Sequence, residues 1–329
     1  MGQLRIEYII LLDNGRIIPQ YRWYPQSMEV SMSTGIAIQT QSLVKNYGRV
    51  QALRGVDLTV RQGEVFGFLG PNGAGKTTTI RCLLDLIRPN GGSLQVLGLD
   101  PQKHPLQVRQ RTGYLPGELR VDDAFTVETA LRFFNNLRGD KADWQHVRAL
   151  AQRIDLDLKM KVKNLSKGNK QKVGVVQALM HRPELLLLDE PTAGLDPLVQ
   201  QEVLCLVAEA KETGATIFFS SHILSEVQQI AERVGIIRQG QVVEVAETQT
   251  LINRSLRRVF LRFKQPVEAG RLTAIPGVTV LARGDGLSLT LQVEGEMDTL
   301  IKTLATFPVV DFETERPTLE EIFLAYYAR

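Results

Sequence analysis

One stretch of nine residues, from Gly70 to Thr78, constrains the fold of this chain more than any other part of its sequence. The stretch reads G-P-N-G-A-G-K-T-T and follows a short apolar run that ends at Leu69. Beyond it, apolar side chains recur at helical spacing, which predicts a helix from Thr77 to Ile87. A G-x-x-x-x-G-K-[ST] pattern between a strand and a helix is typical of a phosphate-binding loop. Chance would produce the bare pattern in roughly one chain of this length in a hundred, and the strand-to-helix context weakens that alternative.

The residue types in this loop match the chemistry of a nucleoside triphosphate. Glycine at positions 70, 73 and 75 lets the backbone curl until successive N–H groups point into one hollow, where the new helix also directs its positive dipole end. Lys76 can reach the terminal phosphates, and the Thr77 hydroxyl can ligate Mg²⁺. The candidate nucleotide-binding residues of the loop are Gly70, Pro71, Asn72, Gly73, Ala74, Gly75, Lys76, Thr77 and Thr78.

A pair of acidic residues behind a buried strand forms the second candidate element of the site. The continuous apolar run from Leu185 to Leu188 is typical of a parallel strand buried on both faces. It delivers Asp189 and Glu190 at its carboxyl end, where open α/β sheets bind ligands. We interpret Asp189 as a Mg²⁺ ligand through water and Glu190 as the base that polarises the attacking water. The structural alternative is that these acids cap the next helix.

A histidine behind the next predicted strand is the third candidate element. The apolar run from Thr216 to Ser220 predicts a strand, and it is followed by Ser221 and His222. A lone histidine is more often a surface residue or a satisfied structural one. Neighbouring parallel strands, however, would bring His222 and Glu190 to the same edge of the sheet.

Two further stretches open predicted helices. A turn that contains Asp196 precedes a helix over 198–210, and Ser166 and Gly168 lie just before a helix with apolar residues from Val173 onward. Several lysines crowd the second stretch. They indicate either a solvated helix face or a helix N-terminus close to an anion.

The composition of the whole chain excludes several classes of protein. Its net charge of +3 is too small to indicate a nucleic-acid surface, and no apolar run approaches the roughly 20 residues of a membrane span. The two cysteines, Cys82 and Cys205, each lie in an apolar helical pattern, which predicts buried free thiols in a reducing compartment. We therefore expect an intracellular protein whose membrane contact, if any, is made through a partner.

The pattern of elements predicts three parts: an N-terminal extension over 1–34, a core over 35–255 and a C-terminal unit over 256–329. We expect the extension to be disordered or to lie upstream of the natural start, and a small hairpin is the alternative. Within the C-terminal unit the order is β-α-β-β-α-β, which is the ferredoxin-like pattern. Those elements are predicted over 259–263, 267–274, 278–282, 287–293, 297–306 and 309–312. A final helix is predicted from a capping box formed by Thr318 and Glu321.

Over residues 36–255 these motifs, in this order and spacing, resemble the nucleotide-binding subunit of an ATP-binding cassette (ABC) transporter. The loop over 70–78 is similar to Walker A, and 185–190 is similar to Walker B with its catalytic glutamate. The run 165–168, with Gln171, is similar to the signature motif that distinguishes this family. Asp196 matches the D-loop, His222 the switch histidine, and Tyr47 the aromatic that stacks on adenine.

The resemblance implies an α/β fold with a phosphate-loop NTPase core: a parallel sheet, an antiparallel β subdomain and a helical subdomain, followed by the ferredoxin-like α+β domain. It also implies an ATPase that requires ATP and Mg²⁺ and works as a head-to-tail dimer in which Ser166 and Gly168 of one copy complete the other's site. A polytopic membrane permease would be the further partner, so the expected place of action is the cytoplasmic face of the membrane.

The sequence departs from the family pattern at two places. The signature reads L-S-K-G-N, without the usual second glycine and glutamine, although Ser166 and Gly168 are kept. In the loop between the core and the helical subdomain, Gly117 stands where the family usually has glutamine, with Glu118 beside it as a candidate substitute near Mg²⁺. This loop and the C-terminal unit look like those of bacterial drug-exporter ATPases, which favours export over import.

Three alternatives remain open at this point. The first is a soluble regulatory ABC ATPase that acts on ribosomes or DNA, although such proteins usually carry two cassettes or long coiled-coil inserts. The second is a non-catalytic cassette, against which the presence of Lys76, Asp189, Glu190 and His222 argues. The third is a phosphate-loop kinase, which would leave the signature-like stretch unexplained.

Overall fold

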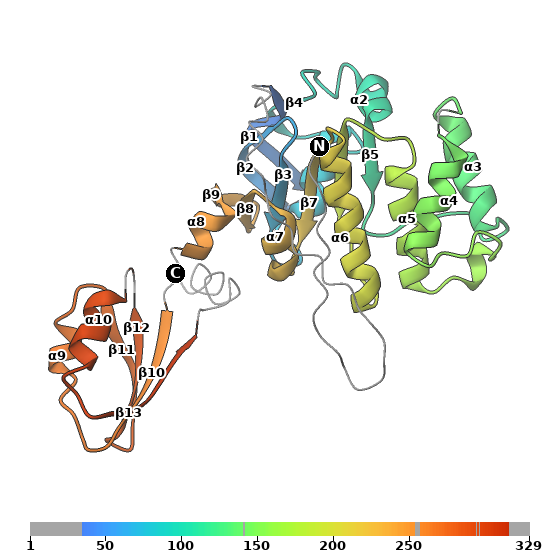
Figure 1. The fold of residues 1–329 in the computed structure, drawn as a ribbon. Coiled ribbons are helices and arrows are strands. Elements are labelled where there is room, and N and C mark those ends of the chain that lie inside the picture. Colours follow the sequence, from blue (N-terminus) through green and yellow to red (C-terminus); the bar gives the residue numbers. More distant parts are fainter. Residues whose placement is uncertain (1–34, 141, 254–256, 294, 296, 316–329) are drawn as a thin grey trace, which may run out of the picture. The chain divides into compact units, whose positions relative to one another are not determined.

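The computed structural model describes residues 35–140, 142–253, 257–293, 295 and 297–315 (Figure 1). The predicted N-terminal extension over 1–34 and the predicted helix from Thr318 lie outside the described residues. Within the described part, no helix combines the length and the apolar character that a bilayer crossing requires.

A six-stranded sheet forms the centre of the larger unit. Its first five strands run parallel, and the last pairs with its neighbour in antiparallel orientation. From one edge to the other, the strands are β5 (Thr112–Leu115), β6 (Leu185–Asp189), β7 (Thr216–Ser221), β3 (Val65–Leu69), β8 (Arg233–Arg238) and β9 (Gln241–Glu247). The strand that precedes the phosphate loop therefore lies beside β7, and β7 lies beside β6.

Alternation along the buried strands explains why their sequences read as continuous apolar runs. Successive side chains of a strand point to opposite faces. In β6, Leu186 and Leu188 join one hydrophobic cluster, while Leu185 and Leu187 join another on the opposite face. The same alternation places Phe218 of β7 in the second cluster. Both faces of the sheet are therefore covered, as the sequence predicts.

A three-stranded antiparallel sheet contributes to the second cluster, and confirms the predicted antiparallel β subdomain. Its order is β2 (Val50–Arg61), β1 (Ile36–Tyr47) and β4 (Gly91–Val96). Buried side chains of these strands, such as Leu43, Leu58 and Val96, pack in one cluster with Phe66 and Phe68 of β3.

The helices of this unit divide between the two clusters. Helices α3, α4 and α5 pack together beside β5 (Figure 1), and they join the first cluster together with residues of α6, α7 and α8. The helices are α1 (Lys76–Leu83), α2 (Pro105–Arg111), α3 (Val127–Leu137), α4 (Trp144–Arg153), the short 3-10 helix η1 (Val162–Asn164), α5 (Lys167–Leu179), α6 (Pro197–Glu212), α7 (Leu224–Ile230) and α8 (Thr248–Asn253).

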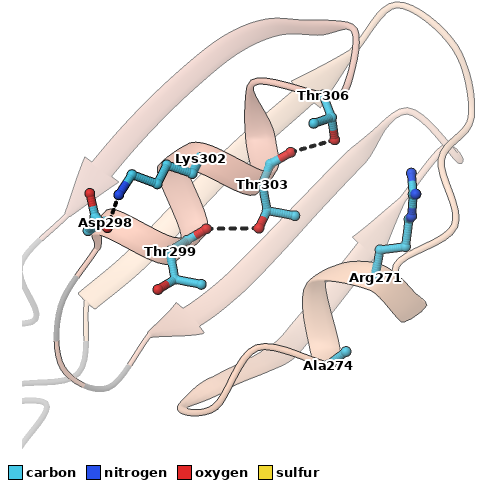
Figure 2. A pocket seen from close by; sticks show the side chains of 7 residues that line it. All are labelled: Arg271, Ala274, Asp298, Thr299, Lys302, Thr303 and Thr306. Carbon is cyan, nitrogen blue, oxygen red and sulfur yellow. Dashed lines mark hydrogen bonds and ion pairs between the residues drawn. The ribbon is translucent and has the colours of Figure 1, made fainter.

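The C-terminal elements form a separate antiparallel sheet with its own hydrophobic cluster. In the sheet the strands lie in the order β11-β12-β10-β13. Along the chain a helix follows β10 and another follows β12, so the order β-α-β-β-α-β confirms the predicted ferredoxin-like pattern. These elements are β10 (Arg257–Phe263), α9 (Gly270–Thr273), β11 (Val278–Gly284), β12 (Ser288–Val293), α10 (Asp298–Leu304) and β13 (Val309–Glu315). A shallow hollow of about 640 Å³ lies between α9 and α10. Lys302, which lines it, forms an ion pair with Asp298 at 2.7 Å (Figure 2).

The structure corrects three sequence expectations. Cys205 is free but exposed, because it lies on the outward side of α6 between the buried residues Leu204 and Leu206. Cys82 is buried as predicted, and burial raises the pKa of its thiol to about 11. Helix α1 ends at Leu83, four residues before the predicted end, and α9 has only four residues.

Gly113 of β5 allows α5 to pack closely against the sheet, and this contact predicts an effect on stability. A Cβ atom on Gly113 of β5 would lie 2.2 Å from the Ala178 carbonyl oxygen of α5. We expect Gly113→Ala to lower the free energy of unfolding by about 1–3 kcal/mol, because the backbone of α5 must shift. Denaturant-induced unfolding measures this change. Gly91→Ala in β4, where a Cβ would lie 3.8 Å from its nearest neighbour, is the control and should stay within about 0.5 kcal/mol of wild type. Equal effects of the two substitutions would contradict the packing argument.

Candidate nucleotide-binding site

The phosphate loop joins β3 to α1 and depends on its glycines. Gly73 and Gly75 have φ values of 81° and 114°, in the left-handed region that favours glycine. Gly70 lies so close to β8 that a Cβ atom there would be 2.5 Å from the Ile237 carbonyl oxygen. The loop is therefore held in one curled conformation whose N–H groups, with the N-terminus of α1, form a site suited to phosphate.

Lys76 lies inside this loop and is almost fully buried, at 5% exposure. Its ammonium group donates to the carbonyl oxygens of Gly70, at 2.5 Å, and Pro71, at 3.3 Å. It also forms an ion pair with Glu190, with 3.1 Å between Nζ and Oε1. A buried cation is thus held at the centre of the loop by one carboxylate and two carbonyls.

Asp189 lies between the phosphate loop and β7. Its Oδ2 accepts a hydrogen bond from the Thr77 hydroxyl at 2.7 Å, and its Oδ1 accepts one from the Ser220 hydroxyl at 2.6 Å. Asp189 and Ser220 are also direct partners in the pairing of β6 with β7. The two residues predicted as metal ligands, Thr77 and Asp189, are therefore adjacent.

Glu190 adopts an unusual backbone conformation, with φ of +53°. Its N–H donates to the backbone and side-chain oxygens of Ser220, each at 3.2 Å, and its carbonyl accepts from the Gln171 amide at 2.8 Å. Its Oε2 lies 2.5 Å from Nδ1 of His222. The carboxylate is thus shared between Lys76 on one oxygen and His222 on the other.

The sequence also left open that Asp189 and Glu190 cap the next helix. In the structure the N-cap of that helix, α6, is Asp196, whose side chain accepts a hydrogen bond from Val199 N at 3.1 Å.

The other sequence-predicted site residues lie apart from this cluster. Ser166 caps α5, where its hydroxyl accepts from Asn169 N at 3.2 Å, and it is exposed. Gly168 packs against the Asp196 loop, since a Cβ atom on it would lie 2.5 Å from the Gly194 carbonyl oxygen. Tyr47 is the last residue of β1 and is 46% exposed, with the Lys45 ammonium 5.4 Å from its ring centroid.

The loop after β5 places Gly117, rather than Glu118, next to Asp189. A Cβ atom on Gly117 would lie 3.2 Å from Asp189 Oδ2. The Glu118 side chain is exposed and lies 3.4 Å from the Arg120 guanidinium. The backbone of this loop therefore approaches the site directly, while the neighbouring carboxylate points to an arginine outside it.

Sequence reasoning missed the role of Ser220. Its hydroxyl is fully buried and contacts both Asp189 and the Glu190 amide. The available signal was a hydroxyl at the end of an otherwise apolar strand, directly before Ser221 and His222. That signal becomes specific only once the register of β6 against β7 is known.

A groove of about 270 Å³, lined by both apolar and polar side chains, lies where the segment after α1 meets β5, α3 and α5. It contains the guanidinium of Arg138, which donates to the carbonyl oxygens of Arg109 and Thr112. Burial lowers the pKa of Arg138, and burial with the nearby Asp189 raises the pKa of Tyr114. The groove is lined by Leu84, Leu86, Arg109, Thr112, Tyr114, Pro116, Leu119, Arg120, Phe134, Arg138 and Gln177.

Two segments of this chain are similar in sequence to known protein families. Residues 53–193 match the family described as "ABC transporter", and residues 252–327 match "ATP-binding protein DrrA1-3-like, C-terminal domain". The bacitracin transport ATP-binding protein BcrA of Bacillus licheniformis is 39% identical over 234 residues, which cover 69% of this chain and 74% of BcrA. The daunorubicin/doxorubicin resistance ATP-binding protein DrrA of Streptomyces peucetius is 34% identical over 305 residues, which cover 88% of this chain and 92% of DrrA.

Solved structures share the fold. The ATP-binding subunit of an ABC transporter superposes with a TM-score of 0.61 at 29% identity and covers 65% of this chain and 91% of its own. A dimeric bacterial ABC transporter cassette gives a TM-score of 0.58 at 22% identity, covering 64% of this chain and 98% of its own. The likeness to the second structure concerns the fold alone.

The position of the Lys76 ammonium predicts its effect on ligand affinity. Loss of a buried cation at the phosphate position removes hydrogen bonds to a charged group, worth roughly 1.5–3 kcal/mol. We therefore expect Lys76→Ala to weaken ATP binding on the order of 10- to 100-fold, measured by titration with a fluorescent ATP analogue. Lys172→Ala is the matched control, because Lys172 is also buried but donates to the Asp155 carbonyl oxygen. An equal loss of affinity in both variants would contradict a specific role for Lys76.

Proposed function

This chain belongs to the ABC transporter family as an ATP-binding subunit, and we propose that it hydrolyses ATP with Glu190 as the general base and His222 as the residue that positions that base. One observation carries the proposal. At the carboxyl edge of the parallel sheet, a single carboxylate contacts both the buried ammonium of the phosphate loop and a histidine. Such an edge is where ligands of open α/β sheets bind.

The ion pair between Lys76 and Glu190 suggests how ATP prepares the base. A triphosphate in the loop offers Lys76 a stronger anionic partner than one carboxylate, so the ammonium turns from Glu190 to the phosphate. Glu190 is then free to accept a proton from water while the water oxygen attacks the γ-phosphorus. The bond between the γ-phosphorus and the ADP oxygen breaks, and inorganic phosphate and ADP result. His222 holds the carboxylate in place through Oε2.

The residues beside the phosphate loop fit Mg²⁺. This ion keeps several waters and usually takes one or two protein oxygens together with substrate phosphates. The Thr77 hydroxyl and the Asp189 carboxylate are 2.7 Å apart at the loop, and the described residues contain no cluster of three or more His, Cys, Asp or Glu side chains suited to a metal. When bound, Mg²⁺ would neutralise negative charge on the transferred phosphoryl group. Thr77 and Asp189 would hold it.

We further propose that two copies of the chain act as a head-to-tail pair. The phosphate loop contacts one side of a triphosphate, so the other side requires donors from elsewhere. Ser166 and Gly168 lie at the N-terminus of α5, a helix of 13 residues whose N-cap is the exposed Ser166. In a second copy this helix end supplies a hydroxyl and backbone N–H groups to the open side of the nucleotide. ATP then holds the pair closed until its γ-phosphate is released.

A polytopic membrane permease is the other proposed partner. Pro116 lines the groove between β5, α3 and α5, and the next residue, Gly117, approaches Asp189, so a helix of the permease in that groove would sense movement of the nucleotide site. BcrA is named for bacitracin transport and DrrA for daunorubicin/doxorubicin resistance, which supports export of an antibiotic-like compound from the cytoplasmic face of the membrane. The same names favour transport over a soluble regulatory ATPase.

Glu190→Gln tests the assignment of the base. An amide cannot accept the proton, so we expect the turnover of ATP to fall on the order of 10²–10⁴-fold, while an ATP-bound dimer accumulates. Phosphate release and size-exclusion chromatography with ATP measure the two effects. Glu184→Gln, which changes an exposed acid at the opposite end of β6 that pairs with Arg111, is the control and should retain wild-type turnover. Wild-type turnover in Glu190→Gln would overturn the assignment.

Leu86→Asp tests the permease groove. Leu86 lines the groove and is 47% exposed, so its substitution should leave the ATPase activity of the isolated subunit unchanged. After co-expression with a candidate polytopic permease, we expect the variant to be lost from the membrane fraction, because the contact would bury the new carboxylate. Val243→Asp, at a residue of β9 with 45% exposure at the far edge of the sheet, should remain bound. Equal membrane recovery of both variants would contradict this contact.

A further inference from the structure

A buried acid on α7 belongs to none of the motifs found in the sequence. Glu226 is 6% exposed and lies four residues after His222. Within the described part of the chain, its Oε1 accepts a hydrogen bond from the Thr192 hydroxyl, and its Oε2 accepts one from the Ser221 hydroxyl at 2.7 Å. Burial of a carboxylate is costly, and the two hydroxyl groups offset part of that cost by donating one hydrogen bond to each oxygen.

The two hydroxyl groups belong to the two segments that carry the reacting side chains. Thr192 lies two residues after Glu190, and Ser221 directly precedes His222. Both are buried, at 2% and 0% exposure. The Ser221 hydroxyl also accepts from Ile223 N at 2.8 Å, which fixes the backbone on the other side of His222. Glu226 therefore connects the segment of the base to the segment of the histidine.

This connection adds to the sheet at the point where strand pairing ends. The last residue pair of β6 with β7 joins Asp189 to Ser220, and the last pair of β3 with β7 joins Leu69 to Ser221, so Glu190 and His222 each follow the last paired residue of their strand. Successive strand residues point to opposite faces, which places the Ser220 and Ser221 hydroxyls on opposite sides of the sheet. Ser220 holds Asp189 and the Glu190 amide on one side. On the other side, Ser221 is held by Glu226.

We propose that Glu226 is a positioning residue for ATP hydrolysis, which holds Glu190 and His222 in contact by accepting hydrogen bonds from Thr192 and Ser221. It acts through these neighbours and does not touch the nucleotide. This inference rests on the proposed function, because it takes Glu190 and His222 as the hydrolytic pair. Thr192 and Ser221 share the role, since each supplies one of the two hydrogen bonds.

Glu226→Ala and Glu226→Gln test the proposal in the full chain. Misplacement of a catalytic group by about 1 Å can cost on the order of 10²-fold in rate, so we expect Glu226→Ala to lower kcat by roughly 10- to 100-fold with KM for ATP kept within about threefold. Glu226→Gln should retain most of the activity, because the amide can accept from one hydroxyl and donate to the other. Wild-type kcat in Glu226→Ala would overturn the proposal.

Glu64→Gln and Glu64→Ala are the matched controls. Glu64 is equally buried, at 6% exposure, and pairs with Arg233 at 2.9 Å, at the opposite end of β3 from the phosphate loop. Loss of this acid should lower the melting temperature and leave kcat of the folded fraction unchanged. If the Glu64 and Glu226 variants lose kcat in parallel with their loss of melting temperature, Glu226 has a purely structural role and the proposal fails.

A double-mutant cycle with His222→Ala separates positioning from stability. His222→Ala alone should lower kcat, and in that background Glu226→Ala should cost less than threefold more, because the contact that it maintains is already lost. An undiminished effect of Glu226→Ala in that background would contradict the proposal.

Should Glu226→Ala fail to fold, Thr192→Val removes one of the two hydrogen bonds with little change of shape and enters the same cycle. If the proposed function itself is wrong, His222→Ala and Glu190→Gln retain wild-type turnover, whereas failure of the present inference leaves those two variants impaired.

Discussion

The carboxylate of Glu190, shared between Lys76 and His222, is the interaction on which this structure depends. Its three participants follow β6, β3 and β7, and β7 lies between the other two strands. Because these strands run parallel, their carboxyl ends meet at one edge, and residues separated by more than a hundred positions in the sequence come into contact. The two hydrophobic clusters fix the strands from both faces, so the packing of the core sets the geometry of the site.

Much of this arrangement could be predicted from the sequence, for physical reasons. A strand buried on both faces must be apolar throughout, so Leu185 to Leu188 identify a central parallel strand without an alignment. The phosphate loop is equally local, since its glycines and lysine act within a single turn. Once both features were fixed, the topology of parallel sheets placed Glu190 and His222 at the same edge, where the structure has them in contact.

Other features depend on register and packing, which single residues do not reveal. The hydroxyl of Ser220 becomes important only because that residue pairs with Asp189, and the pairing of β6 with β7 is a tertiary property. Cys205 follows an apolar pattern, yet it faces outward because α6 buries only one side. Glu118 has the right chemistry for a metal site but lies beside Arg120, while Gly117 approaches Asp189. In each case, the direction of the side chain decides its role.

In the proposed mechanism, ATP releases Glu190 from Lys76 and leaves it paired with His222. A crystal structure of the chain with Mg²⁺ and a non-hydrolysable ATP analogue tests this step most directly. We expect the Lys76 ammonium to contact the terminal phosphates and to have left its position 3.1 Å from Glu190 Oε1, while Glu190 Oε2 remains in contact with Nδ1 of His222. A nucleotide complex in which Lys76 still pairs with Glu190, or in which His222 has left that carboxylate, would contradict it.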